Sequence, residues 1–299
     1  MDSGQTQSGN GLKLFLAGIV FSILWPSAST ASKIALEYAQ PFVISIVRFI
    51  TAGVIMLIIV HQFMRKRMPA GVEWKQLCIY GLLNITLYLS LYIVAMQNVS
   101  AGLGSLSIAT NPVFISLISA VVLRKPLKQK VVFSLALCIT GVMIAAWPLF
   151  ASAHATPLGL TLLILSMVLY SAGVIYFSEK NWNGLHILAI NGWQTLIGGL
   201  FVLPLVLFTY DGSKNDFTSG FFGATLWLAI PVSIVAVQLW LYMLRDNPVK
   251  ASFWLFLCPL AGFVIANVMV REPITIYTII GMLLVITGLY LVQKRKPVS

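Results

Sequence analysis

Charged side chains are rare in this sequence, and two long stretches contain none at all. Only 9% of the residues are Asp, Glu, Lys or Arg, whereas a soluble globular domain carries about 25%. Residues 76–123 and 131–178 lack charge entirely, and each is long enough for two bilayer crossings at about 20 residues per helix. Shorter charge-free runs follow at 181–210, 217–244, 251–270 and 273–293. The sequence therefore predicts an all-α integral membrane protein and excludes a large soluble catalytic domain.

The shortage of acids and histidines argues against an enzyme. The chain has eight acidic residues and three histidines, and His61, His154 and His186 all lie at the ends of apolar runs. An active site needs clustered acids, bases or metal ligands, and no glycine-rich phosphate-binding loop is present either. The three cysteines lie inside apolar runs without metal-ligand spacing, which indicates packing residues. We expect no catalytic residue, no metal and no cofactor.

Ten membrane helices account for the apolar runs, and short turns with proline or glycine join most of them. We predict these helices at 13–34, 41–64, 75–97, 101–123, 128–148, 157–178, 184–208, 220–244, 249–270 and 274–293. The predicted organisation is an N-terminal tail at 1–12, a first five-helix repeat at 13–148, a linker at 149–156, a second five-helix repeat at 157–293 and a basic tail at 294–299.

The distribution of lysine and arginine predicts the orientation, because cytoplasmic loops carry an excess of both. With the N-terminus inside, the inner segments hold 15 of the 19 basic residues. The outer segments hold only Lys33, Lys214 and Arg271, and Arg48 lies inside a predicted span. This bias places both termini in the cytoplasm, in a multi-pass protein of the cell (inner) membrane. It also explains the net charge of +11 without a nucleic-acid partner.

The two halves of the chain resemble each other at a nearly constant spacing. The segment 123–127 lies 147 residues before 270–274, and the same spacing pairs Pro112 with Pro259 and Gly141 with Gly288. Spacings near 145 and of 150 pair Trp25 with Tyr170, Arg48 with Trp193, Tyr88 with Gln238 and Tyr92 with Tyr242. Because five is an odd number of helices, the second half must be inverted relative to the first. Inverted repeats place a substrate site near the midplane, between the halves.

As an ensemble, these residues resemble the drug/metabolite transporter superfamily, and within it the ten-helix EamA-type exporters of metabolites and amino acids. The resemblance rests on the inverted halves, Trp25 in the first helix, Arg48-Phe49 early in the second and a proline within the fourth. Such proteins often carry an acid in the turn after helices 4 and 9. Glu272 keeps this acid in the second half, whereas Lys125 replaces it in the first. The resemblance implies a secondary carrier and names no particular substrate.

Polar and aromatic side chains within the predicted spans are the candidates for a substrate cavity. Tyr80, Asn84, Tyr88 and Tyr92 follow one another at a spacing of four, on one slowly turning helix face. Such a face should not meet lipid, because an unpaired polar group in hydrocarbon is costly, although Tyr80 and Tyr92 also fit interfacial aromatic belts. The predicted cavity residues are Trp25, Asn84, Tyr88, Tyr92, Asn111, Tyr170, Trp193, Gln238, Tyr242 and Trp254. Packing between helices is the alternative role for each.

Three further residues have predicted roles in transport. Pro112 and Pro259 lie within repeat-related spans and are the predicted hinges, because proline removes a backbone hydrogen bond and kinks a helix; a static kink is the alternative. Arg48 lies about 10 Å from the outer end of its helix and is the candidate partner of a substrate carboxylate. Alternatively, Arg48 pairs with Glu37 or reaches the outer interface.

The sequence thus predicts an alternating-access secondary carrier of small metabolites, with amino acids favoured, that binds its substrate in an aromatic- and amide-lined cavity. The alternatives are a carrier of nucleobase-type, drug-like or lipid-like solutes, a channel, and a membrane enzyme. Because no acid or histidine lies at the centre of a span, we expect uniport or exchange rather than strong proton coupling. The expected partners are a small-molecule substrate and the lipid bilayer, and the chain could function as a monomer.

Overall fold

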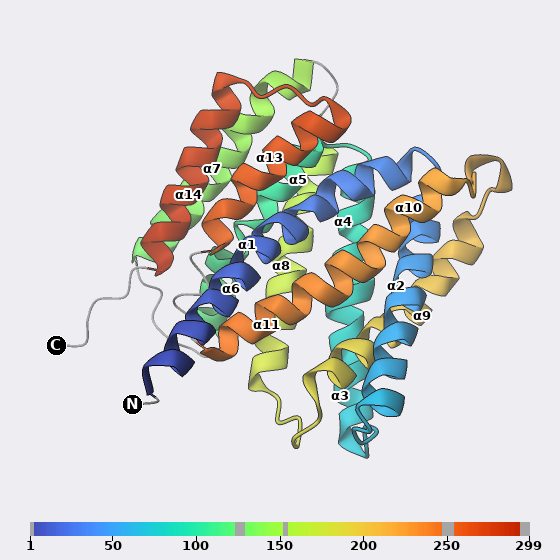
Figure 1. Cartoon of the computed structure of the whole chain (residues 1–299). Helices are drawn as coiled ribbons and strands as arrows, with labels where there is room; N and C mark the ends of the chain where they lie inside the picture. Colours follow the sequence, from blue (N-terminus) through green and yellow to red (C-terminus); the bar gives the residue numbers. More distant parts are fainter. Residues whose placement is uncertain (1–2, 123–128, 152–154, 247–253, 294–299) are drawn as a thin grey trace.

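The computed structural model describes residues 3–122, 129–151, 155–246 and 254–293, and this part of the chain is a bundle of helices without a named strand (Figure 1). The elements are α1 (Ser3–Leu36), α2 (Pro41–Leu57), η1 (Ile58–Phe63), α3 (Val72–Gly81), η2 (Leu82–Leu87), α4 (Tyr88–Met96), α5 (Ala101–Ile108), α6 (Asn111–Val122), α7 (Gln129–Ala151), α8 (Pro157–Glu179), α9 (Ile187–Thr209), η3 (Gly212–Lys214), α10 (Ser219–Trp227), η4 (Leu228–Ala236), α11 (Val237–Asp246), η5 (Trp254–Phe256), α13 (Leu257–Val270) and α14 (Ile276–Gln293). The segments η1, η2 and η4 are π-helical, and η3 and η5 are short 3₁₀ turns.

Seven helices are long and apolar enough to cross a membrane. They are Lys13–Leu36, Pro41–Phe63, Val72–Met96, Gln129–Phe150, Pro157–Glu179, Ile187–Thr209 and Ser219–Trp240. An eighth span is formed if α5 and α6, which bend by 41° at their junction, are taken together. Two further apolar helices, Leu257–Val270 and Ile276–Leu291, are shorter. The protein is therefore a multi-pass membrane protein, while the count of ten spans stays a prediction.

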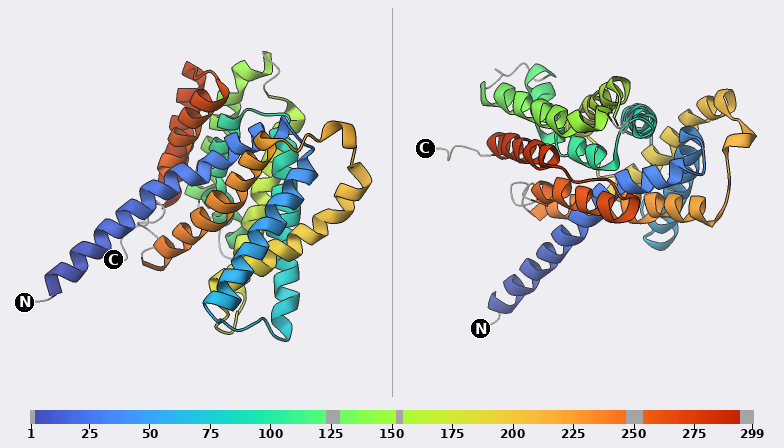
Figure 2. Two further views of the ribbon diagram at one scale, coloured as in Figure 1. Left: turned by 45° about the vertical axis from the view of Figure 1, so that its right-hand side comes forward. Right: turned by 90° about the horizontal axis from the view of Figure 1, so that it is seen from above.

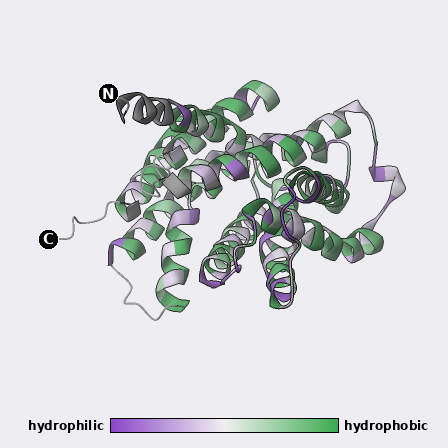
Figure 3. Ribbon diagram, turned by 60° about the horizontal axis from the view of Figure 1, so that its bottom comes forward, coloured by the Kyte–Doolittle hydropathy of each residue, from purple (hydrophilic) through white to green (hydrophobic). Residues whose placement is uncertain are grey.

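The surface of the bundle agrees with this assignment. Apolar residues cover most of the helix surfaces, and hydrophilic residues concentrate toward the helix ends and the connecting loops (Figure 3). Large apolar side chains such as Phe208, Leu207 and Val268 are more than two-thirds exposed. Contiguous exposed apolar surface of this extent is rare on soluble proteins and fits a lipid-facing one.

The connecting segments gather at two opposite ends of the bundle. At one end, Asn98 accepts a backbone hydrogen bond from Thr156, and the Gln40 side chain bonds the 209–215 segment. At the other end, Arg67 donates to the backbone oxygen of Asn183. We call the first the outer end (37–40, 97–100, 155–156, 210–218 and 271–275) and the second the inner end (64–71 and 180–186), after the predicted orientation. The first helix of the first repeat thus leads to the outer end, and the first helix of the second repeat leads to the inner end.

Repeat-related helices pack against each other in two extensive pairs, α2 with α9 and α7 with α14 (Figures 1 and 2). Glycines allow the α7–α14 backbones to meet, because a Cβ atom on Gly141 would lie 2.6 Å from the backbone oxygen of Gly281. A Cβ atom on Gly281 would in turn collide with the backbone oxygen of Gly141. Small residues are the usual means by which membrane helices approach closely. These two pairs stand at opposite sides of the molecule and frame the helices between them.

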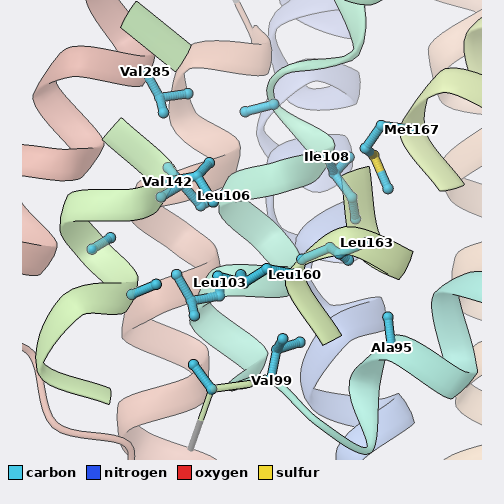
Figure 4. Packing of buried hydrophobic residues seen from close by; sticks show 14 of the residues in the cluster. Ala95, Val99, Leu103, Leu106, Ile108, Val142, Leu160, Leu163, Met167 and Val285 are labelled. Carbon is cyan, nitrogen blue, oxygen red and sulfur yellow. The ribbon is translucent and has the colours of Figure 1, made fainter. Parts of the chain in front are cut away.

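The largest buried apolar cluster lies between these pairs and joins helices from both repeats. Leu103, Leu106 and Ile108 of α5 contact Leu160, Leu163 and Met167 of α8, together with Val142 of α7 and Val285 of α14 (Figure 4). The two repeats therefore share one core.

Local sequence explains where the helices begin. The Ser100 and Thr156 hydroxyls accept N–H bonds from Leu103 and Gly159 and cap α5 and α8. Pro41 and Pro157 open α2 and α8, where the missing N–H would have no helical partner. The third span begins at Val72, three residues before the predicted start, because the Glu73 carboxylate accepts the Ala70 N–H and pairs with Arg67.

The two predicted hinge prolines do not lie within continuous helices. Pro112 is the second residue of α6, directly after the break at Ala109 and Thr110, and Pro259 is the third residue of α13, directly after the η5 turn. Pro112 therefore lies at the start of a half-helix, at a position where an N–H group needs no helical acceptor. It stabilises the start of this second half rather than kinks an intact helix. In the ninth span η5 runs directly into α13, and the residues before η5 lie outside the described part of the chain.

Enlarging the glycines of the α7–α14 pair should destabilise the protein. We expect Gly141→Ala or Gly281→Ala to cost about 1–3 kcal/mol, because the added methyl group meets backbone that cannot move aside. Thermal unfolding in detergent measures the effect. Gly223→Ala is the matched control, since a Cβ atom there meets nothing within 4 Å. Equal melting temperatures for all three variants would show that the close approach is not required.

Candidate functional site

A cavity of about 230 Å³ lies in the middle of the bundle and receives residues from both repeats. Its walls come from α1, α2, α3, η2, α4 and α5 of the first repeat and from α8, α9, η4 and α11 of the second. Membrane carriers built from two repeats bind their substrates at this kind of interface. We call it the central cavity.

One face of the third span forms a wall of this cavity. Tyr80, Asn84, Tyr88 and Tyr92 all line it, over three turns. In a continuous α-helix, residues four apart drift around the axis by about 40° at each step. The π-helical segment Leu82–Leu87 turns less per residue and offsets this drift. The π segment therefore keeps all four side chains on the cavity, including Tyr80, which the sequence had left between the cavity and an interfacial belt.

The aromatic rings of this wall meet rings from the second repeat. The ring centroids of Tyr88 and Tyr170 are 4.9 Å apart, and those of Tyr80 and Phe177 are 5.3 Å apart. Such ring pairs contribute about 0.5–1.5 kcal/mol beyond their buried area. The cavity therefore offers a largely apolar, aromatic surface with hydroxyl groups at its edges.

Arg48 brings a positive charge into the central cavity. Its side chain is buried, and its Nε–H donates to the Ser233 hydroxyl at 3.0 Å. Among the described residues, no Asp or Glu belongs to the cavity lining, and no ion pair includes Arg48. The proposed pair with Glu37 is not formed, since Glu37 lines a different cavity. Because a buried charge is costly unless it is paired, Arg48 is suited to bind an anionic group.

Amide side chains extend the polar part of the wall away from Arg48. Asn191 donates to the backbone oxygen of Ser233 at 3.4 Å, Gln194 donates to Asn191 at 2.9 Å, and Asn84 donates to Gln194 at 3.2 Å. The chain of bonds joins η2, α9, η4 and α2 across the repeat interface. It fixes the orientation of each amide, so that the polar groups of the cavity are held in place before any ligand arrives.

The cavity is closed toward the outer end and reaches exposed residues toward the inner end. Ser178, at the inner end of α8, is exposed and belongs to the lining. Toward the outer end, Ile93, Ala95 and Met96 beyond Tyr92 are buried, and the Tyr92 hydroxyl bonds Ser29 at 2.7 Å. The exposed part of the lining therefore lies in the inner half of the bundle.

The structure brings six of the predicted cavity residues and candidate ligands together. Trp25, Arg48, Asn84, Tyr88, Tyr92 and Tyr170 line the central cavity. Their roles in binding remain predictions.

Five other predicted cavity residues lie elsewhere. Trp193 packs near the inner end, where it donates to His61 and meets the Trp74 ring. Trp254 packs on Phe15 and α1. Asn111 is buried at the start of α6, Tyr242 is 43% exposed, and Gln238 is half-buried outside the lining.

The misplacement in the eighth span has a structural cause. The π-helical segment η4, which contains Pro231, shifts the residues that follow it around the helix axis. Val237 and Trp240 consequently line the cavity in place of Gln238 and Tyr242. A sequence alignment that assumes regular α-helix cannot detect this rotation, and the spacing of 150 between Tyr88 and Gln238 was the only sign of extra residues.

Two residues of the cavity lining are not among the predicted cavity residues, although their sequence pattern indicated contacts within the protein. Asn191 and Gln194 lie three apart on α9, next to the glycine-rich face that packs on α2 and α3. Two amides on the packed face of an apolar helix have to find partners within the protein. Their spacing, rather than their distance from the span centre, was the informative feature.

Comparisons with known proteins agree with this architecture. A crystal structure titled "Crystal structure of protein" superimposes with a TM-score of 0.63 at 14% identity, covering 94% of this chain and 97% of that chain, which shows a shared fold. Protein PecM of Dickeya dadantii is 26% identical over 92% of this chain and 93% of its own length. Uncharacterized transporter YvbV of Bacillus subtilis is 25% identical over 93% of this chain and 89% of its own length.

A family model described as the EamA-like transporter family matches twice, at residues 12–147 and 157–293. The two matches coincide with the two sets of helices that share the central cavity. YvbV is a transporter by name. From these matches, which together cover nearly the whole chain, we conclude that the protein belongs to the EamA-like transporter family.

Proposed function

We propose that the protein is an alternating-access carrier of amino acids or closely related small carboxylates, which bind in the central cavity. The observation that carries the proposal is Arg48, a buried cation that contacts the Ser233 hydroxyl and the Phe49 ring in a cavity whose described lining includes no acidic residue. A substrate carboxylate can supply the missing counter-charge, with the geometry of a planar guanidinium.

The rest of the lining fits the remainder of such a substrate. Binding sites for small molecules are mostly apolar with a few fixed polar groups. The rings of Trp25, Tyr88 and Tyr170 provide the apolar surface, and the amide chain from Asn191 to Asn84 provides the fixed polar groups. A volume of about 230 Å³ suits a solute of amino-acid size.

The half-helices give the proposal a means of movement. The α5–α6 break joins two half-helices through a short connection beside Pro112, and in the ninth span the η5 turn leads directly into α13 near Pro259. Rotation at these two points would open one end of the cavity while the α2–α9 and α7–α14 pairs stay packed. Because the described cavity lining includes no Asp, Glu or His, we propose uniport or exchange without an obligatory proton.

Counterflow in proteoliposomes tests the carrier directly. We expect vesicles preloaded with an unlabelled amino acid to accumulate the same labelled amino acid transiently, without any pH gradient. A matched panel of nucleobases and cationic drug-like solutes should give no accumulation. Signal for nucleobases alone would reject the amino-acid substrate, and flux that neither saturates nor shows counterflow would indicate a channel.

Removing the charge of Arg48 should weaken binding of the carboxylate selectively. Charged hydrogen bonds contribute about 1.5–3 kcal/mol, so Arg48→Met should raise the apparent KM about 10- to 100-fold. Ser233→Ala is the control, because it removes the hydroxyl that Arg48 bonds and keeps the charge. Transport of the amino-acid amide, which lacks the carboxylate, should change little in Arg48→Met. An equal loss for acid and amide would assign Arg48 to packing instead.

The orientation can be tested with an impermeant thiol reagent on intact cells. Lys214→Cys, at an exposed outer-end position, should be labelled at once, and the lost surface ion pair with Asp211 should matter little. Met68→Cys, at the inner end and 51% exposed, should be labelled only after permeabilisation. The parent protein sets the baseline from its three native cysteines. The reverse pattern would place both termini outside.

A further inference from the structure

A second cavity, of about 410 Å³, lies at the outer end. Its lining includes Lys33 and Glu37 of the first span, Met96 and Gln97 after α4, and Arg271 and Glu272 between α13 and α14. We call it the vestibule. Met96 is one helical turn beyond Tyr92 on the same helix. Since Tyr92 lines the central cavity and Met96 lines the vestibule, the two cavities follow each other along α4, and a thin layer of side chains separates them.

The separating layer is a buried cluster of hydroxyl groups. The Ser29 hydroxyl bonds the Tyr92 hydroxyl at 2.7 Å, and Ser105 donates to Ser29 at 3.0 Å and to the backbone oxygen of Pro26 at 3.1 Å. All of these side chains are at most 2% exposed. The bonds join α1, α4 and α5, so the layer stays closed as long as α5 keeps its position against α1.

The position of α5 also depends on Glu272. Its carboxylate accepts the backbone N–H groups of Ala101 and Gly102, the latter at 2.9 Å, while the Ser100 hydroxyl caps Leu103. These are the first N–H groups of α5, which have no acceptor within the helix and carry its positive dipole end. A carboxylate from a distant segment therefore holds the start of α5.

The backbone of Glu272 is itself fixed to α13. Its N–H bonds the Ala266 oxygen, and its own oxygen accepts from the Asn267 side chain at 2.8 Å. The contact thus links the end of α13 to the beginning of α5, the two repeat-related helices that begin or break near Pro112 and Pro259. Further along this interface, a Cβ atom on Gly102 would collide with the Phe263 ring, so α5 and α13 are in tight contact.

We propose that Glu272 is a positioning residue of the transport cycle, which holds the outer side of the carrier closed by binding the start of α5. Separation of α5 from α13 and α1 opens the hydroxyl layer and joins the vestibule to the central cavity. This separation requires the carboxylate to release both N–H groups. The effect on transport rests on the proposed carrier function, whereas the contact between Glu272 and α5 does not depend on which substrate is carried.

The sequence does not repeat this carboxylate in the first half. The repeat-related position of Glu272 is Lys125, which lies outside the described residues. A lysine side chain cannot accept backbone N–H bonds, so Lys125 cannot supply an equivalent of the Glu272 contact. The asymmetry agrees with a structure whose central cavity reaches exposed residues at its inner end.

Sided labelling of the central cavity tests the role of Glu272 without any substrate. Ala28→Cys places a thiol in the cavity lining on α1, and an impermeant thiol reagent is applied to intact cells and to inverted vesicles. In this parent we expect labelling mainly from the inner side. Addition of Glu272→Gln should raise the outer-side labelling rate about tenfold, because a neutral acceptor forms bonds roughly half as strong and has a single acceptor oxygen. Glu272→Asp keeps the charge and should restore part of the closure.

Two further variants distinguish an effect of the contact between Glu272 and α5 from an effect of the negative charge in the vestibule. Glu37→Gln removes the other acid of the vestibule and should leave outer-side labelling unchanged. Ala101→Pro removes one N–H donor without changing any charge, at a helix start where proline is favoured and after a Ser100 backbone that is already extended. It should act in the same direction as Glu272→Gln.

Unchanged outer-side labelling in both Glu272→Gln and Ala101→Pro, with folded protein by size-exclusion chromatography, would overturn the proposal. An equal rise in Glu37→Gln would also overturn it, since it would assign the effect to vestibule charge. Failure of amino-acid counterflow combined with the expected labelling pattern would reject the substrate and keep the role of Glu272.

Discussion

The absence of water from the bilayer core is the constraint on which this structure depends. Every backbone N–H and C=O group in hydrocarbon must find a partner within the protein, so a helix can break only where the protein surrounds it. The break between α5 and α6 obeys this rule. Ala109 and Thr110 are buried, the Thr110 hydroxyl bonds the Ser107 oxygen, and the Val113 N–H bonds the Thr110 oxygen. The interruptions that transport requires are therefore confined to the shared core of the two repeats.

The same constraint divides the bundle into a fixed and an adjustable part. The α7–α14 pair, and α9 with α2 and α3, approach each other closely at glycines. The helices between them also meet at a glycine, since Gly102 approaches the Phe263 ring, but they add hydroxyl, ring and carboxylate contacts, as at Ser29, Tyr92 and Glu272. Side-chain contacts of this kind can be exchanged for others as helices rotate. The exchangeable contacts therefore lie near the central cavity.

The sequence predicted the membrane architecture because charge-free runs and proline-marked turns are local signals. It also identified the face of the third span, since Asn84, Tyr88 and Tyr92 repeat at a helical spacing. It failed in the eighth span, where η4 rotates the helix and replaces Gln238 and Tyr242 by Val237 and Trp240. It did not detect the contact of Glu272 with α5, 171 residues away in sequence from Ala101. Rotations by π segments and long-range caps depend on tertiary packing, which no local pattern encodes.

Glu272 and Arg48 differ in how far the protein compensates their charges. Glu272 has two backbone N–H partners at a helix start, so its charge is compensated within the structure and stabilises one arrangement of α5. Arg48 bonds the neutral Ser233 hydroxyl and lies over the Phe49 ring, so its charge is only partly compensated and gains from any anion that enters. A charge that the protein satisfies fully can hold a conformation, and a charge that it satisfies partly can hold a ligand. This difference in partners, rather than the presence of charge in the membrane, supports the proposed roles of Glu272 in closure and of Arg48 in binding.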